Sequence, residues 1–342
     1  MFNICLIGAG GVGTIAAYVL ESSQRARVTA VLRSNYTAVH EHGFDIDSVD
    51  HGHVTGWKPH RVVPSLSAAA RTDTPYDFIV ITTKALPSTT ASLLTLLPGL
   101  ITPQKTSIVL IQNGLDIEEP FAAAFPTTPV MSSSSMIGSH RTSPNAVVHE
   151  DPDVSRIEPY IHHTDPDPNT QALCSETQRA AAQTFVTLYS AGLAAAHPTT
   201  GAECILTHGL GARWRKLLWN GTFNPLCTLL RVSVGALLRG PGRTTLLEPA
   251  MREMAAIATA AGYGDAVSEE VVVEVLGGTP ETSGFRPSML VDLEGGRVLE
   301  IEAILGAPLR VAREKNVPTP VLRWVYEALR VVQWGLERQV YK

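Results

Sequence analysis

Cysteines and long apolar runs are scarce in this sequence. Its 342 residues include four cysteines, which form no CxxC pair and lie mostly inside short apolar segments: Cys5, Cys174, Cys204 and Cys227. This usage argues against a disulfide scaffold and favours buried free thiols. No stretch approaches the roughly 20 apolar residues of a membrane helix, and the first residues lack the basic segment and the small-residue cleavage site of a secretory signal. We therefore expect a cytoplasmic protein without a membrane partner.

An excess of positive charge is also missing. The chain has 27 Lys and Arg residues against 32 Asp and Glu residues, which gives a net charge of -5. We therefore expect no nucleic-acid partner, although a local basic patch remains open. Hydrophobic residues make up 44% and charged residues 17%, a balance that argues against intrinsic disorder. At roughly 100–200 residues per domain, the length suggests two folded domains.

A glycine-rich turn stands near the N-terminus. It consists of Gly8, Ala9, Gly10, Gly11, Val12 and Gly13. The apolar segment 3–7 precedes it, a segment typical of an amphipathic helix follows over 14–20, and 28–32 is typical of a second buried strand. Gly8 permits a tight turn, Gly10 lets the backbone approach a pyrophosphate, and Gly13 allows close packing of helix on strand. This order predicts a dinucleotide-binding unit, in which the helix N-terminus attracts the anion.

The residue that follows the second predicted strand indicates which cofactor is preferred. An NAD-binding site usually places Asp or Glu there, to bind the ribose 2′-hydroxyl, but this chain has Arg33. A guanidinium can pair bidentately with a 2′-phosphate, which a carboxylate would repel. We therefore predict NADP(H) as the cofactor; the alternative is a solvated surface arginine.

A histidine-rich stretch follows, with His40 and His42 before the alternating segment 44–47, and then His51 and His53. On an extended strand, a His-x-His pair places both imidazoles on one face but supplies no defined third ligand. The alternation of Phe44 and Ile46 with polar residues is typical of an exposed β-hairpin. We expect no metal site here.

Two further apolar segments, 77–84 and 106–114, are typical of buried strands, and each ends in polar residues. In an open α/β sheet, the ligand lies beyond the carboxyl ends of the strands. Lys84 and the run Gln112, Asn113 and Gly114 are therefore expected beside the cofactor, unless they are ordinary strand ends.

The later part of the chain is mainly helical in pattern. Short strands and a helix over 171–191 are expected before residue 197, with 192–196 as a last strand. We place the boundary there, with an α/β dinucleotide-binding domain over 1–197 and a helical domain over 198–342. Helices are predicted over 202–232, 243–262, 265–276 and 301–315, with a last one from Thr319 onward.

Three polar residues share one face of a predicted helix in the second domain. Lys216, Asn220 and Asn224 stand at positions i, i+4 and i+8, and Pro225 is expected to kink or end the helix directly after Asn224. A reductase needs such a stripe, because hydride addition to a carbonyl produces an alkoxide that an ammonium can stabilise and protonate. Ordinary surface pairs at helical spacing are the alternative.

Taken together, these motifs resemble one family over nearly the whole chain. They are the glycine turn with Arg33, Lys84 after its strand, Gln112-Asn113-Gly114, the Lys216, Asn220 and Asn224 helix, and Ser288-Met289-Leu290 followed by Glu300-Ile301-Glu302. The sequence is similar to the 2-dehydropantoate 2-reductases, or ketopantoate reductases. This resemblance implies a Rossmann-type domain followed by a helical domain like that of 6-phosphogluconate dehydrogenase, and NADPH-dependent reduction of 2-dehydropantoate to (R)-pantoate in pantothenate biosynthesis.

The resemblance also implies roles for individual residues. Lys216 would be the proton donor, with Glu300 as a second catalytic residue that contacts the cofactor ribose or orients the site. Asn113, Asn220, Asn224 and Ser288 would bind the 2-oxo acid together with Lys216. Besides the glycine turn and Arg33, the cofactor would contact Lys84 near the adenine and Asn113 near the nicotinamide. The apolar C-terminal helices are compatible with either a homodimer interface or a filled core.

One position departs from the family pattern. Many members carry another asparagine about ten residues after the second helix asparagine, where this chain has Val234; Arg231 and Ser233 are the candidates to replace it. Reduction of another 2-oxo acid, branched or aromatic, therefore stays open as an alternative. A non-catalytic NADPH-binding regulator is a further one.

Overall fold

The computed structural model describes residues 1–72, 74–161, 168–196 and 201–338, with the side chains of 168–174 outside the description. The chain forms two compact units. The first comprises Met1–Lys84, Ser88–Gln112 and Ile117–His208, and the second comprises Ala85–Pro87, Asn113–Asp116 and Gly209–Lys342. The boundary expected between residues 197 and 198 lies outside the described residues.

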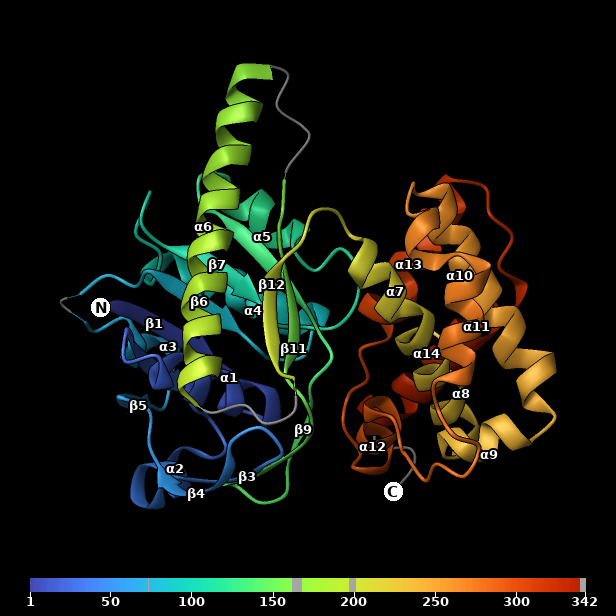
Figure 1. Cartoon of the computed structure of the whole chain (residues 1–342), viewed down its shortest axis with the longest axis horizontal. Helices are drawn as coiled ribbons and strands as arrows, with labels where there is room; N and C mark the ends of the chain where they lie inside the picture. Colours follow the sequence, from blue (N-terminus) through green and yellow to red (C-terminus); the bar gives the residue numbers. More distant parts are fainter. Residues whose placement is uncertain (73, 162–167, 197–200, 339–342) are drawn as a thin grey trace. The chain divides into compact units, whose positions relative to one another are not determined.

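The first unit contains every strand in the described part of the chain (Figure 1). Its strands are β1 (Phe2–Ile7), β2 (Ala26–Val31), β3 (Phe44–Ser48), β4 (Gly52–Trp57), β5 (Arg61–Val63), β6 (Phe78–Ile81), β7 (Ser107–Leu110), β8 (Val130–Ser135), β9 (Gly138–Arg141), β10 (Ala146–Asp151), β11 (Val154–Pro159) and β12 (Glu203–Leu206). Its helices are α1 (Gly11–Ser22), α2 (Tyr36–His42), α3 (Leu66–Ala69), α4 (Pro87–Leu96), the 3₁₀ turn η1 (Leu97–Gly99), α5 (Glu119–Ala124) and α6 (Pro168–Ala195).

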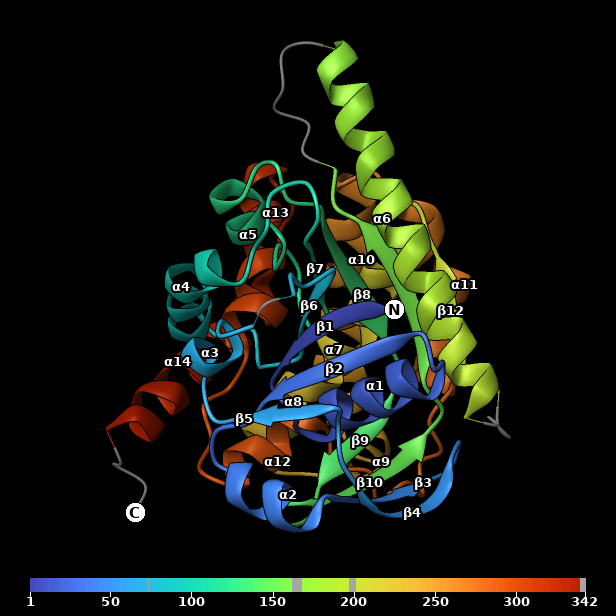
Figure 2. The same ribbon diagram turned by 90° about the vertical axis from the view of Figure 1, so that its left-hand side faces the viewer.

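An eight-stranded sheet forms the centre of this unit, in the order β12-β11-β8-β7-β6-β1-β2-β5. Neighbouring strands run parallel except β11 and β8, which are antiparallel. Central strands β1, β6 and β7 are apolar and nearly fully buried, because helices cover both faces: α1 and α6 on one, α4 and α5 on the other (Figure 2). The expected α/β fold of the Rossmann type is confirmed.

A second sheet, in the order β4-β3-β10-β9, belongs to the same unit. Strands β3 and β4 form the expected hairpin, but the expectation of an exposed one is wrong. Phe44 and Ile46 are fully buried, because their side chains pack in the apolar core of the unit. Strand β3 also pairs in parallel with β10, a strand about a hundred residues later. His40 and His42 lie in α2 rather than on the hairpin.

The strand expected over 192–196 is also wrong, because these residues continue and end helix α6. The alanines around Gly192 favour a helix. Gly192 lets α6 pack close to α1, since a Cβ there would lie 1.9 Å from the carbonyl oxygen of Val19. The last strand is β12, which pairs in parallel with β11.

The second unit is helical, as expected. Its helical segments are α7 (Gly211–Asn220), α8 (Phe223–Leu230), α9 (Val234–Arg239), η2 (Arg243–Leu247), α10 (Glu248–Ala260), η3 (Gly264–Val267), α11 (Glu269–Gly277), α12 (Ser288–Glu294), η4 (Glu302–Gly306), α13 (Ala307–Glu314) and α14 (Pro320–Glu337). Its core contains the fully buried Trp214, Leu218 and Phe223. The predicted helix over 202–232 is interrupted, since β12 occupies its start.

The thiols of Cys5, Cys204 and Cys227 are free and buried, as expected, and the side chain of Cys174 lies outside the described residues. Burial raises the pKa of Cys5 and of Cys227 to about 12. These thiols are therefore protonated and unreactive at neutral pH. Within the described ranges, no helix combines the length and the apolar character needed to cross a membrane.

Candidate active site

The glycine turn between β1 and α1 has the geometry that its sequence predicts. Gly8 has a φ of +102°, and a Cβ there would lie 2.9 Å from the backbone nitrogen of Thr83. A Cβ on Gly13 would lie 2.1 Å from the carbonyl oxygen of Gly8, an oxygen that also accepts a short hydrogen bond from the Thr82 hydroxyl. Only glycine fits at these two positions, so the turn is fixed against β6.

Gly10 differs from the other glycines of the turn. It is exposed, and no atom lies within 4 Å of the place where a Cβ would stand. Helix α1 begins at the next residue, and no side chain caps it. Because the first N–H groups of a helix have no acceptor within the helix, this end can bind an anion. The open space at Gly10 therefore fits a pyrophosphate better than it fits a packed turn.

Two contacts that support this turn were not predicted from the sequence. The buried Asn35 donates a hydrogen bond from Nδ2 to the carbonyl oxygen of Ala9, at 3.2 Å. A Cβ on Gly11 would lie 2.5 Å from the carbonyl of Ser139 on β9. Both partners come from segments that no local pattern links to the turn.

The expected cofactor residues of the first unit gather at one edge of the sheet. Strands β1, β2, β6 and β7 run parallel, so their carboxyl ends lie at the same edge. Arg33 is exposed shortly after β2, and Lys84 follows β6. Gln112, after β7, donates a hydrogen bond from Nε2 to the carbonyl oxygen of Thr83 at 2.6 Å. The Gln112–Thr83 pair therefore lies beside the glycine turn, because Thr83 also closely approaches Gly8.

The second unit brings together three residues that are far apart in the sequence. The ammonium of Lys216, on α7, donates a hydrogen bond to Oδ1 of Asn113 at 2.7 Å. Nδ2 of Asn220, one turn later on α7, lies 3.5 Å from the same oxygen. The expected face of α7 is thus polar and directed at Asn113.

The Asn113 segment is held in place by its neighbours. Gly114 has a φ of +102°, and a Cβ there would lie 2.4 Å from the Cβ of Ala303. Leu115 donates a backbone hydrogen bond to the carbonyl oxygen of Ala303 at 2.8 Å. The buried guanidinium of Arg213 binds the carbonyl oxygen of Gly114 at 2.7 Å. Sequence reasoning missed Arg213, because its helical spacing from Lys216 looks like that of any surface residue.

Electrostatics make Lys216 an unusually weak base for a lysine. Burial of the ammonium and the positive charge of Arg213 lower the pKa of Lys216 to about 7, against an opposing effect of Glu300. Its hydrogen-bond partner Asn113 is a neutral amide, which does not stabilise the charged form as a carboxylate would. At neutral pH this side chain can both hold and release a proton.

Glu300 and Glu302 have different partners. Oε1 of Glu300 accepts a hydrogen bond from the backbone N–H of Ala85 at 2.8 Å, and Glu300 acts electrostatically on Lys216. Glu302 accepts a hydrogen bond from the hydroxyl of Tyr326 at 2.8 Å. Only Glu300 belongs to the group around Lys216.

The prediction that Asn224 continues the face of the Lys216 helix is wrong. Helix α7 ends at Asn220, and Asn224 lies in the first turn of the separate helix α8. Pro225 explains the break, because its ring would clash with the carbonyl of Gly221 in a continuous helix but is accepted in a first turn. Asn224 is buried, and its Oδ1 has no hydrogen-bond partner in the described part of the chain.

Ser288 is exposed at the start of α12, a helix that packs against α8, which carries Asn224. The residues near Val234 have packing and capping roles. Val234 is fully buried in the core. The Ser233 hydroxyl accepts a hydrogen bond from the N–H of Ala236 and caps α9. Ser233 thus has a structural task, so it is a poor replacement for the missing asparagine.

Two family models match this chain. The family model described as ketopantoate reductase PanE/ApbA matches residues 4–160, and the model of the C-terminal part of that family matches residues 210–333. An uncharacterized protein of Saccharomyces cerevisiae is 32% identical over 99% of this chain and 96% of its own length.

Solved structures show the same fold. The 2-dehydropantoate 2-reductase from Methylococcus capsulatus is 30% identical, with a TM-score of 0.79 over 98% of both chains. A D-mandelate dehydrogenase, solved with NADH and anilino(oxo)acetate, has a TM-score of 0.77 over 98% of this chain and 99% of its own, at 21% identity. At that identity the second likeness concerns the fold alone.

Proposed function

Because this chain belongs to the ketopantoate reductase PanE/ApbA family of oxidoreductases, we propose that it reduces 2-dehydropantoate to (R)-pantoate with NADPH. The observation that carries this proposal is the hydrogen bond between Lys216 and Asn113, at 2.7 Å. It joins an ammonium with a pKa of about 7 to an amide in a segment fixed by Gly114 and Arg213. Such an ammonium is suited to give a proton to a developing alkoxide.

The first unit supplies the cofactor residues in this proposal. The turn from Gly8 to Gly13 fits a pyrophosphate, because Gly10 is open and the N-terminus of α1 is uncapped. Arg33 is exposed and would bind the 2′-phosphate, and Lys84 would lie near the adenine. Bound NADPH would supply the hydride for the substrate carbonyl.

The second unit supplies the substrate and proton-transfer residues. Lys216 would hold the carbonyl oxygen and protonate it as the negative charge develops. The amides of Asn220 and Asn224 would bind the polar groups of the acid, together with the Ser288 hydroxyl. The orphaned Oδ1 of Asn224 is an acceptor that a substrate hydroxyl would satisfy. Asn113 and Glu300 would orient the ammonium and contact the cofactor.

An aromatic 2-oxo acid is the second candidate substrate. Trp219 stacks on Phe223 with ring centroids 5.2 Å apart, and Phe285 approaches Trp219 edge-on at 5.8 Å. Trp219 and Phe223 are the sequence neighbours of Asn220 and Asn224, and Phe285 is exposed. The absence of the usual asparagine at Val234 also favours a substrate with fewer polar groups.

A substrate panel tests the proposal. The purified chain is incubated with NADPH or NADH and with 2-dehydropantoate, a branched 2-oxo acid or phenylglyoxylate, and cofactor oxidation is followed by absorbance. We expect the highest kcat/KM with NADPH and 2-dehydropantoate. A preference for phenylglyoxylate would support the aromatic alternative. Tight NADPH binding without turnover of any 2-oxo acid would instead support the non-catalytic regulator.

A further inference from the structure

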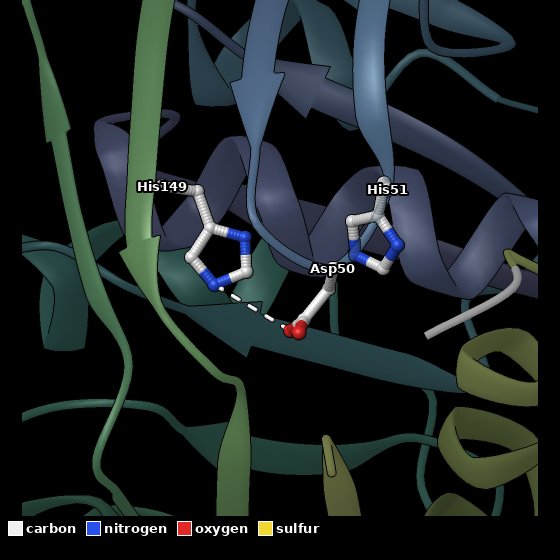
Figure 3. A group of neighbouring side chains, drawn as sticks. All are labelled: Asp50, His51 and His149. Atoms are coloured by element: carbon white, nitrogen blue, oxygen red, sulfur yellow. Dashed lines mark ion pairs between the residues drawn. The ribbon is translucent and has the colours of Figure 1, made fainter. Parts of the chain in front are cut away.

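Two histidines and an aspartate meet inside the first unit, away from the glycine turn. Asp50 and His51 lie in the turn between β3 and β4, and His149 lies on β10. One ligand atom from each of the three side chains lies within 4.8 Å of the others. Asp50 and His149 are buried, and His51 is partly buried. Figure 3 shows the side chains directed toward one another.

The inward nitrogens of both histidines are unsatisfied. Nε2 of His51 and Nε2 of His149 are buried, and neither has a hydrogen-bond partner among the described residues. Nε2 of His149 lies 3.7 Å from Oδ2 of Asp50, which is too long for a hydrogen bond. A buried polar atom without a partner costs about 1–3 kcal/mol, so two of them facing one carboxylate call for an explanation.

The outward-facing Nδ1 atoms of both histidines, in contrast, have hydrogen-bond partners. Nδ1 of His51 lies 3.4 Å from the carbonyl oxygen of Ala196, so it must carry the proton, which leaves Nε2 with a free lone pair. Nδ1 of His149 lies 2.8 Å from Oγ of Ser48. A histidine that binds a metal through one nitrogen generally gives the other N–H to a carbonyl or similar acceptor. This arrangement matches that requirement at His51 and is compatible with it at His149.

A Ser-His-Asp catalytic triad is the other chemistry that these residues could suggest, and the structure argues against it. Oγ of Ser48 already accepts hydrogen bonds from the backbone N–H groups of Asp50 and His51, at 3.2 and 3.0 Å. Ser48 is buried, so a substrate carbonyl has no access to it. Its hydroxyl closes the β3–β4 turn and is not poised as a nucleophile.

We propose that Asp50, His51 and His149 bind a divalent transition-metal ion of the zinc class. Imidazole nitrogens and a carboxylate oxygen are the ligands that zinc accepts at bond lengths of about 2.0–2.2 Å, which puts neighbouring ligand atoms roughly 3.3 Å apart. The 3.7 Å between His149 and Asp50 is close to that spacing. Three protein ligands leave the fourth position to a water molecule.

Binding of the ion exchanges protons in a defined way. In the metal-free protein, the Ser48 hydroxyl can donate to Nδ1 of His149, which puts the imidazole proton on Nε2, facing Asp50. An ion bound at Nε2 would take the place of that proton, which moves to Nδ1 of the same ring; the Ser48 hydroxyl would then turn its own proton away, so that its oxygen faces Nδ1–H. Asp50 also accepts a hydrogen bond from the N–H of Asp153 at 2.9 Å, so the ion would tie the β3–β4 turn to β10 and to the segment before β11.

Metal titration of the whole chain tests this inference without any activity assay. The protein is stripped with EDTA and dialysed, and Zn²⁺ is then titrated in competition with a chromophoric chelator. We expect about one tight equivalent per chain and a higher Tm for the loaded protein, because an ion that binds only the folded state stabilises it. Co²⁺ is added separately, and its visible absorption should be that of a tetrahedral site with nitrogen and oxygen ligands.

Matched variants assign the ligands. His51→Gln should weaken Zn²⁺ binding by about 100-fold or more, as should Asp50→Asn, which keeps the size of the side chain. His53→Gln is the control, because His53 is exposed two residues away, and it should change the affinity by less than about twofold. Circular dichroism verifies that each variant is folded. No tight equivalent in the parent protein, or equal Zn²⁺ affinity in His51→Gln and the parent, would overturn the proposal.

Discussion

Lys216 donates a hydrogen bond to Asn113 across 103 positions of sequence, at 2.7 Å. The acceptor is a neutral amide, and the nearby charges are of both signs: Arg213 lowers and Glu300 raises the pKa of the ammonium. Burial has the largest effect, and the resulting pKa is about 7. The hydrogen bond therefore orients the amine, but the amine can still gain and lose a proton near neutral pH. A group that donates a proton to an alkoxide needs both properties.

The rate of reduction should depend on pH through Lys216. The pKa lies below the usual value for lysine, so the ammonium is complete below about 7 and is lost as the pH rises through it. We expect kcat for reduction to fall toward tenfold per pH unit above that value, and the reverse oxidation to accelerate over the same range. Stopped-flow single turnovers at a series of pH values measure the rate of reduction and the rate of the reverse oxidation. A flat reductive profile from pH about 6 to 9 would contradict the role of Lys216.

Arg213 should influence the pH above which kcat for reduction falls. Replacing it by Gln removes the second cause of the lowered pKa, and the shorter side chain also gives up the contact of Nη1 with the carbonyl oxygen of Gly114. We expect the fall of kcat for reduction to begin at a higher pH in Arg213→Gln than in the parent protein. Arg215→Gln is the control, since Arg215 is partly exposed and pairs with Glu274. An unchanged pH dependence of kcat in a folded Arg213→Gln protein would show that Arg213 serves only to hold the Asn113 segment.

Arg33 should determine the choice between NADPH and NADH. In Arg33→Asp, a carboxylate would face the 2′-phosphate, so we expect NADPH to bind about 10–150-fold more weakly, equivalent to roughly 1.5–3 kcal/mol. NADH affinity should change little. Fluorescence titration of both cofactors measures this, with Arg27→Asp as a control on an exposed residue of β2, the strand that Arg33 follows. Parallel losses for both cofactors would point to damage of the turn.

The two ends of the glycine turn should respond differently to alanine. In Gly13→Ala the new Cβ would lie 2.1 Å from a backbone oxygen, so we expect a loss of about 1–3 kcal/mol of folding stability, seen as a lower Tm. In Gly10→Ala the methyl group would enter open space, so the Tm should stay while NADPH affinity falls. Normal NADPH binding by Gly10→Ala would remove Gly10 from the cofactor site.

The sequence was sufficient to predict the elements that have a local signature. The strand, glycine turn and helix at Gly8–Gly13 can be read locally because their steric demands fall on neighbouring residues. The same holds for the spacing of Lys216 and Asn220. The position of Asn224 could not be predicted correctly by periodicity alone, because Pro225 moves the helix break to the turn before it.

Contacts between distant segments could not be predicted from a single sequence. The pairing of β3 with β10 places His149 beside Asp50, and no spacing rule connects residues about a hundred positions apart. For that reason the histidine-rich stretch showed no third ligand. Asn35 and Arg213 were missed for the same reason. Each donates a hydrogen bond to a backbone carbonyl in a distant segment, and the residues around the donor do not show which segment that is.

The most direct test of the central claim compares the parent protein with Lys216→Ala, in parallel with Lys315→Ala as a control on an exposed lysine of the same unit. NADPH affinity is measured by fluorescence, and kcat by NADPH oxidation with 2-dehydropantoate. We predict near-parental NADPH affinity in both variants and a kcat about 10²–10⁴-fold lower in Lys216→Ala alone. A folded Lys216→Ala protein that binds NADPH and turns over at the parental rate would contradict the claim.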